Sequence, residues 1–147
     1  MNNTCADTEG GLNAPPGTER IHVWNLIVRR AAATASQTYD LYTEGGLTLD
    51  VQNSLFSASP RFTDGREQTS CAGLAQIAPT SGCLSADPLF VSETDFHLQA
   101  SSPAVDSGMA PSVDATFQAL YGLSVAVDRD GRPRPAGLGW DRGAYER

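Results

Sequence analysis

Apolar and polar residues alternate along the first half of the chain. In residues 21–28 an apolar side chain recurs at about every second position, which places His22 and Trp24 on the opposite face. Residues 47–56 show the same period, and residues 39–44 show a shorter version of it. A period of two is typical of a β-strand with one buried face. These three stretches therefore predict β-strands.

Two of these stretches also match each other. Residues 23–28 can be laid over residues 51–56 at an offset of 28 (53 − 25 = 28), which aligns Asn25 with Asn53. Repeats of about 20–50 residues are typical of proteins built from stacked structural units. In such a stack, equal positions lie above one another and side-chain amides form hydrogen-bonded ladders. We expect parallel strands at this offset, with Asn25 and Asn53 as a structural amide pair.

The rest of the chain is rich in turn-forming residues. Glycine and proline are frequent in residues 1–20 and 58–86, which is typical of loops. A helix is expected at 113–121, with Ser112 as its N-cap and Gly122 just past its end. The predicted organisation is a lead-in or cap at 1–20 and a single domain at 21–147, with rungs at 21–57, a loop at 58–86 and a closing region at 87–147.

Composition and charge narrow the range of partners. The chain has 10 basic and 17 acidic residues, a net charge of −7, and all of its basic residues are arginine. The absence of lysine excludes Schiff-base catalysis and a phosphate-binding P-loop. The acidic balance argues against a nucleic-acid partner, because such a partner needs clustered positive charge. No apolar run approaches the roughly 18 residues of a membrane span, so we expect no membrane span, and we expect no cofactor.

The cysteines are candidates for a disulfide or a zinc site, and the acidic residues are candidates for a calcium site. Cys71 and Cys83 lie twelve positions apart (83 − 71 = 12) and are a candidate disulfide, with two buried reduced thiols as the alternative. Cys5 stands alone near the start of the chain. A zinc site is not expected, because no C-x-x-C motif occurs. A calcium loop at residues 128–131 is an alternative use of the acidic residues there, but neighbouring arginines oppose it.

The second half of the chain carries a series of short motifs. They are Asp87-Pro88-Leu89-Phe90, Asp95-Phe96-His97-Leu98, Ser102-Pro103-Ala104-Val105-Asp106, Asp128-Arg129-Asp130-Gly131-Arg132 and Asp141-Arg142-Gly143-Ala144-Tyr145-Glu146. In this order they resemble the closing region of the choice-of-anchor Q group of right-handed parallel β-helix, or pectate-lyase-like, proteins. The resemblance implies an all-β fold: a short right-handed parallel β-helix (solenoid) with a loop-rich C-terminal clasp and one short α-helix.

Charged residues of these motifs are expected to hold the closing region together. Asp106 is suited to accept hydrogen bonds from nearby backbone N–H groups, and Asp130 with the glycine after it marks a turn. Arg132 or Arg134 is expected to pair with the acidic members of the set through charge-assisted hydrogen bonds. The complete predicted structural set is Asn25, Asn53, Asp106, Asp128, Asp130, Arg132, Arg134 and Glu146.

Two functions compete for the outward faces of the predicted strands. The resemblance implies polysaccharide binding or cleavage, by a lyase or a glycoside hydrolase, as one of them. Such catalysis needs a base or a pair of facing carboxylates. The candidates are His22, Asp40, Glu44 and Asp50 for catalysis, with Trp24 and Tyr42 as sugar-binding aromatics. Outward charges on a strand face are more often simply solvated, so we expect a non-catalytic structural or interaction module.

Size and the start of the chain bear on partners and location. A short stack leaves its first rung uncovered, and an open strand edge tends to associate. The expected partner is a second copy of the chain or a longer β-helix, with polysaccharide as the alternative. No positively charged segment followed by an apolar stretch is seen at the start, so no signal peptide is predicted. An extracellular or cell-surface location is implied by the resemblance alone.

Overall fold

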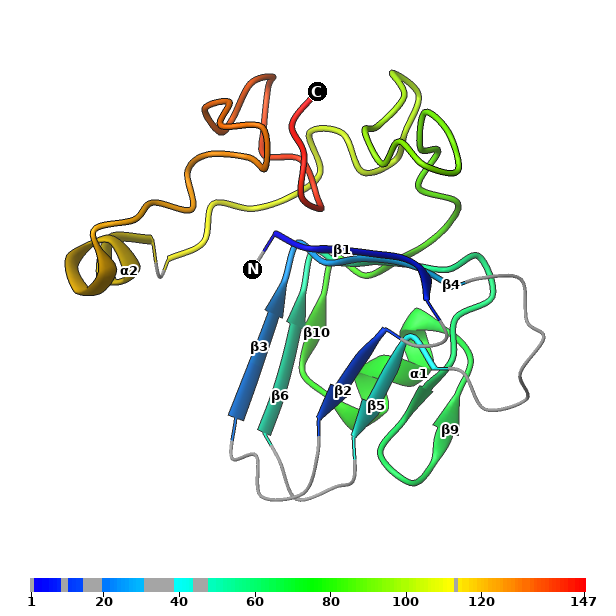
Figure 1. Cartoon of the computed structure of the whole chain (residues 1–147). Helices are drawn as coiled ribbons and strands as arrows, with labels where there is room; N and C mark the ends of the chain where they lie inside the picture. The colour runs from blue at the N-terminus through cyan, green and yellow to red at the C-terminus, as the bar shows by residue number, and fades with distance from the viewer. Residues whose placement is uncertain (1, 9–10, 15–19, 31–38, 44–47, 113) are drawn as a thin grey trace.

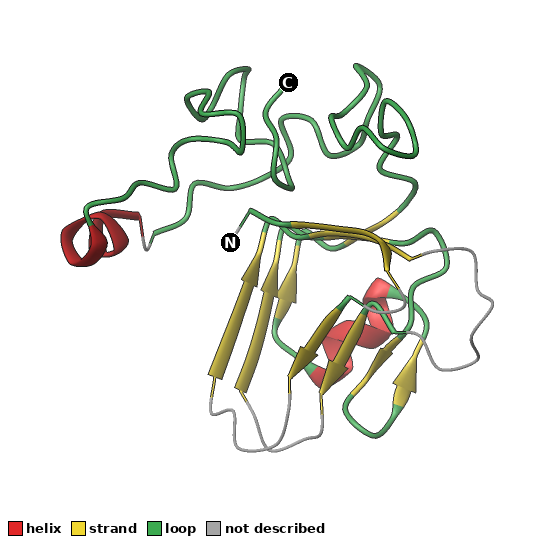
Figure 2. Cartoon of the chain, viewed as in Figure 1, coloured by secondary structure: helices red, strands yellow, loops and turns green. Residues whose placement is uncertain are grey.

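Three short β-sheets and two helices form the described part of the chain (Figures 1 and 2). The computed structural model describes residues 2–8, 11–14, 20–30, 39–43, 48–112 and 114–147. The strands are β1 (Thr4–Thr8), β2 (Leu12–Ala14), β3 (Arg20–Trp24), β4 (Ile27–Arg30), β5 (Leu41–Thr43), β6 (Thr48–Gln52), β7 (Leu55–Phe56), β8 (Phe62–Thr63), β9 (Glu67–Gln68), β10 (Thr80–Ser81) and β11 (Leu84–Ser85). The helices are α1 (Cys71–Ile77) and α2 (Asp114–Tyr121).

Consecutive strands of the chain lie in different sheets, except for β8 and β9. The first sheet has the order β1-β4-β7-β11, the second β10-β6-β3 and the third β2-β5-β8-β9. The strand pairs are parallel except β8 with β9, which is antiparallel. Parallel neighbours need a long crossover connection, so each strand pairs with one from the following or preceding turn of the chain. Segments distant in sequence are thereby brought side by side.

The prediction of an all-β, right-handed parallel β-helix is wrong. The described residues form short parallel and mixed sheets together with two helices, a small arrangement of the α/β type. Strands β7 to β11 have only two residues each, and the third sheet ends in the antiparallel β8–β9 pair. Within the described closing region, strand pairing is limited to isolated bridges. The sequence after residue 57 lacks the alternation that a further full set of strands requires.

The predicted offset of 28 residues is confirmed for β3 with β6, where Val23 pairs with Val51, and for β4 with β7, where Ile27 pairs with Leu55. The run at 21–28 is nevertheless two strands, because the chain turns at Asn25 (φ 54°) between β3 and β4. Asn53 makes the same turn, with φ 44°, between β6 and β7. Asparagine is among the few residues that tolerate a positive φ. The two aligned asparagines therefore mark equivalent corners of the chain.

Asn25 does not form the expected amide ladder with Asn53. Its side chain donates to Asn2 Oδ1 and to the Met109 carbonyl oxygen, each at 2.7 Å. It also accepts a hydrogen bond from the Met109 N–H at 2.9 Å, and its own carbonyl accepts one from Gly143 at 2.7 Å. Asn25 is fully buried. This residue therefore connects the N-terminal strands to the closing region.

Replacing Asn25 with glycine is expected to lower the free energy of unfolding by about 2 kcal/mol more than Asn53→Gly, because net hydrogen bonds contribute roughly 1 kcal/mol each. Glycine adopts the positive φ of both corners without strain, so the two variants share the backbone effect of glycine. They differ in the side-chain hydrogen bonds of Asn25. Urea denaturation of both variants measures the difference, and equal losses of stability contradict this account of the two corners.

The first sheet is buried on both faces. In β4, Val28 packs in the core shared with the other two sheets, whereas its neighbour Ile27 packs in a second core beneath the closing region. In β7, Phe56 and Leu55 divide between the two cores in the same way. Parallel sheets covered on both faces carry continuous apolar runs instead of alternating ones. The closing region thus covers the outer face of this sheet, as Figure 1 shows above β1 and β4.

Two segments expected to be loops contain regular structure. Within residues 1–20, β1 pairs with β4 and β2 pairs with β5, so the described part of the expected lead-in belongs to the sheets. Within residues 58–86, a helix forms after Ser70, whose hydroxyl accepts from the Gly73 N–H at 3.0 Å as an N-cap. Pro79 follows the end of this helix. Short strands on both sides of α1 were likewise missed.

Two other local predictions are confirmed. Cys71 and Cys83 form the disulfide, which joins the start of α1 to the residue before β11, and Cys5 is a free thiol. The helix expected at 113–121 is α2, and none of its described residues is buried. No helix in the described part of the chain is long and apolar enough to cross a membrane.

Candidate functional site

Four polar and aromatic side chains gather on the outer face of β3 and β6. The parallel register places His22 beside Asp50 and Trp24 beside Gln52. Asp50 Oδ2 lies 3.1 Å from His22 Nδ1 and accepts a hydrogen bond from Trp24 Nε1 at 3.0 Å. Gln52 donates to both carboxylate oxygens of Asp50, at 3.0 and 3.3 Å. The carboxylate is thus the common acceptor of three neighbouring side chains.

Hydrogen bonding keeps the Asp50 carboxylate ionised. Desolvation by burial opposes ionisation, but the hydrogen bonds from Gln52, His22 and Trp24 outweigh it, so the pKa of Asp50 is lowered. Trp24 is only 9% exposed, which leaves little of its ring to stack on a sugar. His22 remains half-exposed beside it, with the two ring centroids 5.4 Å apart. The cluster therefore suits a charged, hydrated surface better than a sugar-stacking platform.

Asp40 does not meet the requirement of catalysis for an accessible base. Its side chain is fully buried and forms an ion pair with Arg30 at 2.7 Å. It also accepts hydrogen bonds from the backbone N–H groups of Ser57, at 3.1 Å, and Arg61, at 2.9 Å. A polymeric substrate does not reach a carboxylate enclosed in this way. Asp40 connects three segments of the chain as an internal anchor.

Among the described residues, the remaining strand candidates add no second accessible carboxylate. Glu44 lies outside the described residues. Tyr42 is half-buried, and its ring packs against Tyr39 with centroids 5.7 Å apart. The Arg61 guanidinium lies over the Tyr39 ring at 4.7 Å. The structure therefore brings together His22, Trp24 and Asp50 from the predicted set, and it does not join them to Asp40 or Tyr42 through any described contact.

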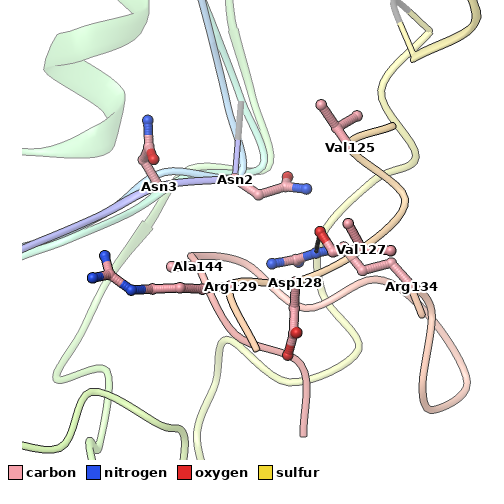
Figure 3. A pocket seen from close by; sticks show the side chains of 8 residues that line it. All are labelled: Asn2, Asn3, Val125, Val127, Asp128, Arg129, Arg134 and Ala144. Atoms are coloured by element: carbon pink, nitrogen blue, oxygen red, sulfur yellow. Dashed lines mark hydrogen bonds between the residues drawn. The ribbon is translucent and has the colours of Figure 1, made fainter. Parts of the chain in front are cut away.

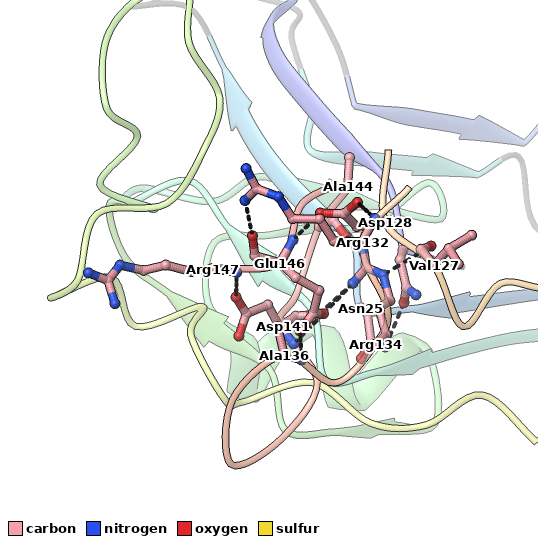
Figure 4. Close-up of polar contacts among 12 residues, drawn as sticks. Asn25, Val127, Asp128, Arg132, Arg134, Ala136, Asp141, Ala144, Glu146 and Arg147 are labelled. Atoms are coloured by element: carbon pink, nitrogen blue, oxygen red, sulfur yellow. Dashed lines mark hydrogen bonds and ion pairs between the residues drawn. The ribbon is translucent and has the colours of Figure 1, made fainter. Parts of the chain in front are cut away.

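The closing region contains a dense set of polar contacts around Asp128 (Figure 4). The Asp128 carboxylate accepts hydrogen bonds from the backbone N–H groups of Asp130 at 2.9 Å, Arg132 at 2.8 Å and Glu146 at 3.0 Å. Burial favours the protonated form of Asp128, but these hydrogen bonds prevail and its pKa is lowered. Asp128 therefore closes the turn at 128–132 and fixes the C-terminal residues to it, in the structural role expected of it.

A buried ion pair joins Arg134 to Glu146. Nη1 of Arg134 lies 2.8 Å from Oε1 of Glu146, and the two side chains are 1% and 0% exposed. Arg134 Nη2 also donates to the Gly143 carbonyl at 2.9 Å. Glu146 accepts from the backbone N–H groups of Asp141 and Ala136, each at 3.0 Å. This pairing is one of those expected from the sequence, and both charges have additional hydrogen-bond partners.

The other predicted members of this set take smaller roles. Arg132 Nη2 lies 3.7 Å from Asp130 on the exposed side of the turn, and its Nη1 donates weakly to the Glu146 carbonyl at 3.4 Å. Asp106, at φ 51°, accepts from the Gly139 N–H at 2.8 Å. No described contact joins the Asp106 carboxylate to an arginine. Backbone N–H groups therefore take the place that the sequence analysis assigned to a guanidinium partner.

Sequence reasoning missed two central residues of this region, Asp141 and Arg142. Arg142 Nη1 donates to the carbonyls of Ser54 and Gly82, each at 2.9 Å, and its Nε donates to Ser107 O at 3.1 Å. The side chain is buried, and desolvation lowers the pKa of Arg142 to about 10, so it remains charged at neutral pH. It is one of the polar links that join the closing region to the strands, beside the Ala144 N–H, which donates to Thr4 Oγ1 of β1 at 3.0 Å. Arg142 belongs to the last of the C-terminal motifs, but the pattern of that motif does not show where the side chain points.

Asp141 holds the same segment from the other side. Its carboxylate accepts from the backbone N–H groups of Asp106 at 2.7 Å and Arg147 at 2.8 Å. Desolvation by burial raises the pKa of Asp141, against the effect of these hydrogen bonds. Two acidic residues of the closing region, Asp128 and Asp141, thus accept hydrogen bonds mainly from backbone N–H groups. They do not form an open acidic cluster.

His97 lies between two carboxylates at the surface of the closing region. Its Nε2 is 2.9 Å from Asp130 Oδ2, and its Nδ1 contacts Asp95 Oδ1. The Tyr145 ring lies against the imidazole with centroids 4.1 Å apart. The two aspartates raise the pKa of His97, Asp130 more than Asp95. His97 belongs to the motif at 95–98, but nothing in that motif predicts this arrangement.

A pocket of about 310 Å³ lies where the N-terminal residues meet the closing region (Figure 3). Asn2 and Asn3 form one wall, and Arg129, Asp128 and Arg134 are among the residues of the other. The Asp128 carboxylate and the Arg134 guanidinium are occupied by the contacts described above. Two polar groups that line the pocket, those of Asp128 and Arg134, are therefore already engaged in contacts that stabilise the fold.

A wider hollow of about 600 Å³ lies beside Arg30 and Arg61. Arg30 is paired with Asp40 and Arg61 with Glu67, at 2.7 and 3.0 Å. The positive charges are thus balanced by carboxylates of the same chain. Among the described residues, no group of three or more histidine, cysteine or acidic side chains is placed to hold a metal ion.

Comparison with known proteins adds no relative to this description. No family model, no curated protein and no solved structure matches the chain.

Proposed function

We propose that this chain is a non-catalytic interaction module that associates with a second copy of itself through the open edge of β3. The observation that carries the proposal is the position of β3, which pairs with β6 on one side and with no strand among the described residues on the other. An open edge offers unpaired backbone N–H and C=O groups to another strand. A two-fold arrangement lets two such edges satisfy each other and closes the assembly.

The hydrogen-bonding direction of β3 follows from its pairing with β6. The Asn25 N–H donates to the Gln52 carbonyl at 3.1 Å, toward β6. Backbone groups of successive residues in a strand point to opposite sides. The N–H groups of Val23 and Ile21 therefore face β6, and those of His22 and Trp24 face the open edge. This places a regular pair of donors along β3 for an incoming strand.

β3 is better suited to pairing than the other edge strands at this end of the sheets. β1 has a shift of register between Ala6 and Thr8, and β2 has only three residues. Bulges and short length are devices that protect sheet edges from association. β3 pairs with β6 in unbroken register over Arg20 to Trp24 and contains no proline. Its first residue is its only arginine or acidic residue.

The disposition of charge supports a non-catalytic role. Asp40 is enclosed by Arg30, and Glu146 is enclosed by Arg134. Asp50 is the accessible carboxylate of the outer β3–β6 face, with no second carboxylate among its described contacts. A glycosidase needs two carboxylates that flank the scissile bond. Among the described residues of the outer β3–β6 face, where the catalytic candidates His22 and Asp50 lie, that pair is missing.

Sedimentation velocity over a range of protein concentrations tests the proposal through two substitutions of one residue. His22→Pro removes the outward N–H of β3 and places a ring at the edge, whereas His22→Ala removes the same imidazole and keeps the N–H. We expect wild type and His22→Ala to form a dimer as concentration rises, and His22→Pro to remain monomeric. Circular dichroism establishes that both variants are folded.

A different set of outcomes refutes the proposal. A wild-type chain that stays monomeric at every concentration contradicts it, and so does a dimer that survives in folded His22→Pro. If His22→Pro does not fold, Arg20→Pro offers a second block, because the N–H of Arg20 also faces the open edge at the start of the strand. Dimerisation that persists in folded Arg20→Pro then counts against the β3 edge.

A further inference from the structure

His97 is enclosed by acidic groups from two separate segments. Asp95 belongs to its own loop, and Asp130 belongs to the turn that Asp128 closes. Tyr145 packs on the ring from the C-terminal segment, and Arg132 lies 3.7 Å from Asp130 on the far side of that carboxylate. Asp95, Asp130 and Tyr145 are the charged and titratable groups among the described contacts of His97, and Arg132 lies beyond Asp130. The imidazole is 34% exposed, so solvent protons reach it.

Both ring nitrogens of His97 face an acceptor. A carboxylate that is ionised only accepts hydrogen bonds, so each ring nitrogen needs a proton to bind its partner. The imidazolium form supplies two N–H groups, whereas the neutral form supplies one and turns a lone pair toward the other carboxylate. The arrangement is therefore complete only when His97 is protonated. Neutral His97 keeps one of its two hydrogen bonds and meets repulsion at the other.

The two segments that His97 joins are otherwise held by different contacts. Its own loop folds back on itself through the Phe90–Leu98 bridge and the hydrogen bond from Val91 N–H to His97 O at 2.9 Å. The turn around Asp130 is closed by the Val127–Pro133 bridge. The link between Asp130 and His97 spans 33 positions of the chain. It is the described side-chain hydrogen bond that ties these two turns together.

We propose that His97 is a pH-sensitive link that fastens the turn at 128–132 to the loop at 90–98 when the imidazole is protonated and loosens it when the imidazole is neutral. At high pH, Asp128 and Arg134 continue to hold the closing region together, and Arg142 continues to join it to the carbonyls of Ser54 and Gly82. The effect is therefore a local opening at the surface, confined to the two turns, and not an unfolding of the chain.

The direction of the pH dependence follows from the raised pKa of His97. A folded-state pKa above the ordinary value of about 6.5 means that protonation stabilises the folded arrangement. The stabilisation is fully present below about pH 6.5 and is lost as the pH rises through the folded-state value. Asp95 sets the low-pH limit of this stabilisation, because its hydrogen bonds with His97 lower its pKa. Its contribution is lost only as the solution becomes strongly acidic.

Histidine NMR titration of the whole chain provides the first test. We expect the His97 ring resonances to titrate with a pKa above about 6.5, and Asp130→Asn to lower that pKa, because one of the two carboxylates is removed. The backbone N–H at position 130 still donates to Asp128 in this variant. A wild-type His97 that titrates at or below the ordinary value contradicts the proposal, and so does a pKa unchanged by Asp130→Asn.

Hydrogen exchange provides the second test, with rates corrected for the intrinsic effect of pH. Protection of the amides in 90–98 and 128–132 is expected to fall several-fold between about pH 6 and about pH 8.5 in wild type. The fall should vanish in His97→Gln and persist in His22→Gln, which alters the other histidine of the chain. The same fall in His97→Gln overturns the link. If His97→Gln does not fold, the NMR titration of wild type and Asp130→Asn decides the matter.

Discussion

Glu146→Gln is expected to lower the free energy of unfolding by about 4 kcal/mol, because removing one partner of a buried ion pair leaves an uncompensated charge. The Arg134 side chain is only 1% exposed, so solvent compensates poorly for the lost carboxylate. Glutamine also puts an amide where Asp141 and Ala136 now donate their backbone N–H groups. Chemical denaturation monitored by tryptophan fluorescence measures the loss.

Glu67→Gln is the matched control for this substitution. Glu67 also pairs with an arginine, Arg61, at 3.0 Å, but the two side chains are 25% and 47% exposed. Exposed ion pairs contribute about 0–1 kcal/mol, so the same chemical change should have little effect there. If Glu146→Gln and Glu67→Gln destabilise the chain equally, the buried pair does not hold the closing region in place.

Arg142→Met is expected to cost about 3 kcal/mol, because hydrogen bonds to charged groups contribute about 1.5–3 kcal/mol and buried acceptors are left without donors. Its guanidinium donates hydrogen bonds to the carbonyls of Ser54, Gly82 and Ser107. Methionine fills a similar volume with an unbranched chain and supplies no donor. The release of a desolvated charge offsets part of the loss, as the lowered pKa of Arg142 indicates.

Arg66→Met is the comparison for Arg142→Met. Arg66 is 70% exposed on its side chain and contacts Asp64 two positions away, so its replacement should change stability little. Thermal denaturation of the two variants and wild type, under identical conditions, measures the difference. A stability of Arg142→Met at or above that of Arg66→Met contradicts the role given to the Arg142 guanidinium.

The pairing of β3 with β6 and of β4 with β7 was readable from the sequence, and the architecture was not. The offset that aligns Asn25 with Asn53 gave the correct register of β3 with β6, because parallel strands place equal positions side by side. The same pattern concealed the corner at Asn25, since the alternation of apolar residues continues across it. Strands as short as two residues, and a hairpin at β8–β9, carry too little pattern to predict.

The contacts of the charged residues in the closing region were likewise predictable only in part. The pair of Arg134 with Glu146 was among the expected combinations, since opposite charges in a compact loop region tend to pair. The contacts of Arg142 were not foreseen, because its partners are backbone carbonyls up to 88 positions away, which side-chain types do not encode. His97 was missed for a related reason: only the fold brings Asp130 to within 2.9 Å of it.

Hydrogen exchange of wild type at low and high protein concentration shows whether the chain associates through the open edge of β3. We predict that the amides of His22 and Trp24 become protected as dimer forms, while those of α2, where Leu120 and Tyr121 are 69% and 65% exposed, exchange at unchanged rates. Association with new protection at α2 and none at β3 would contradict the account.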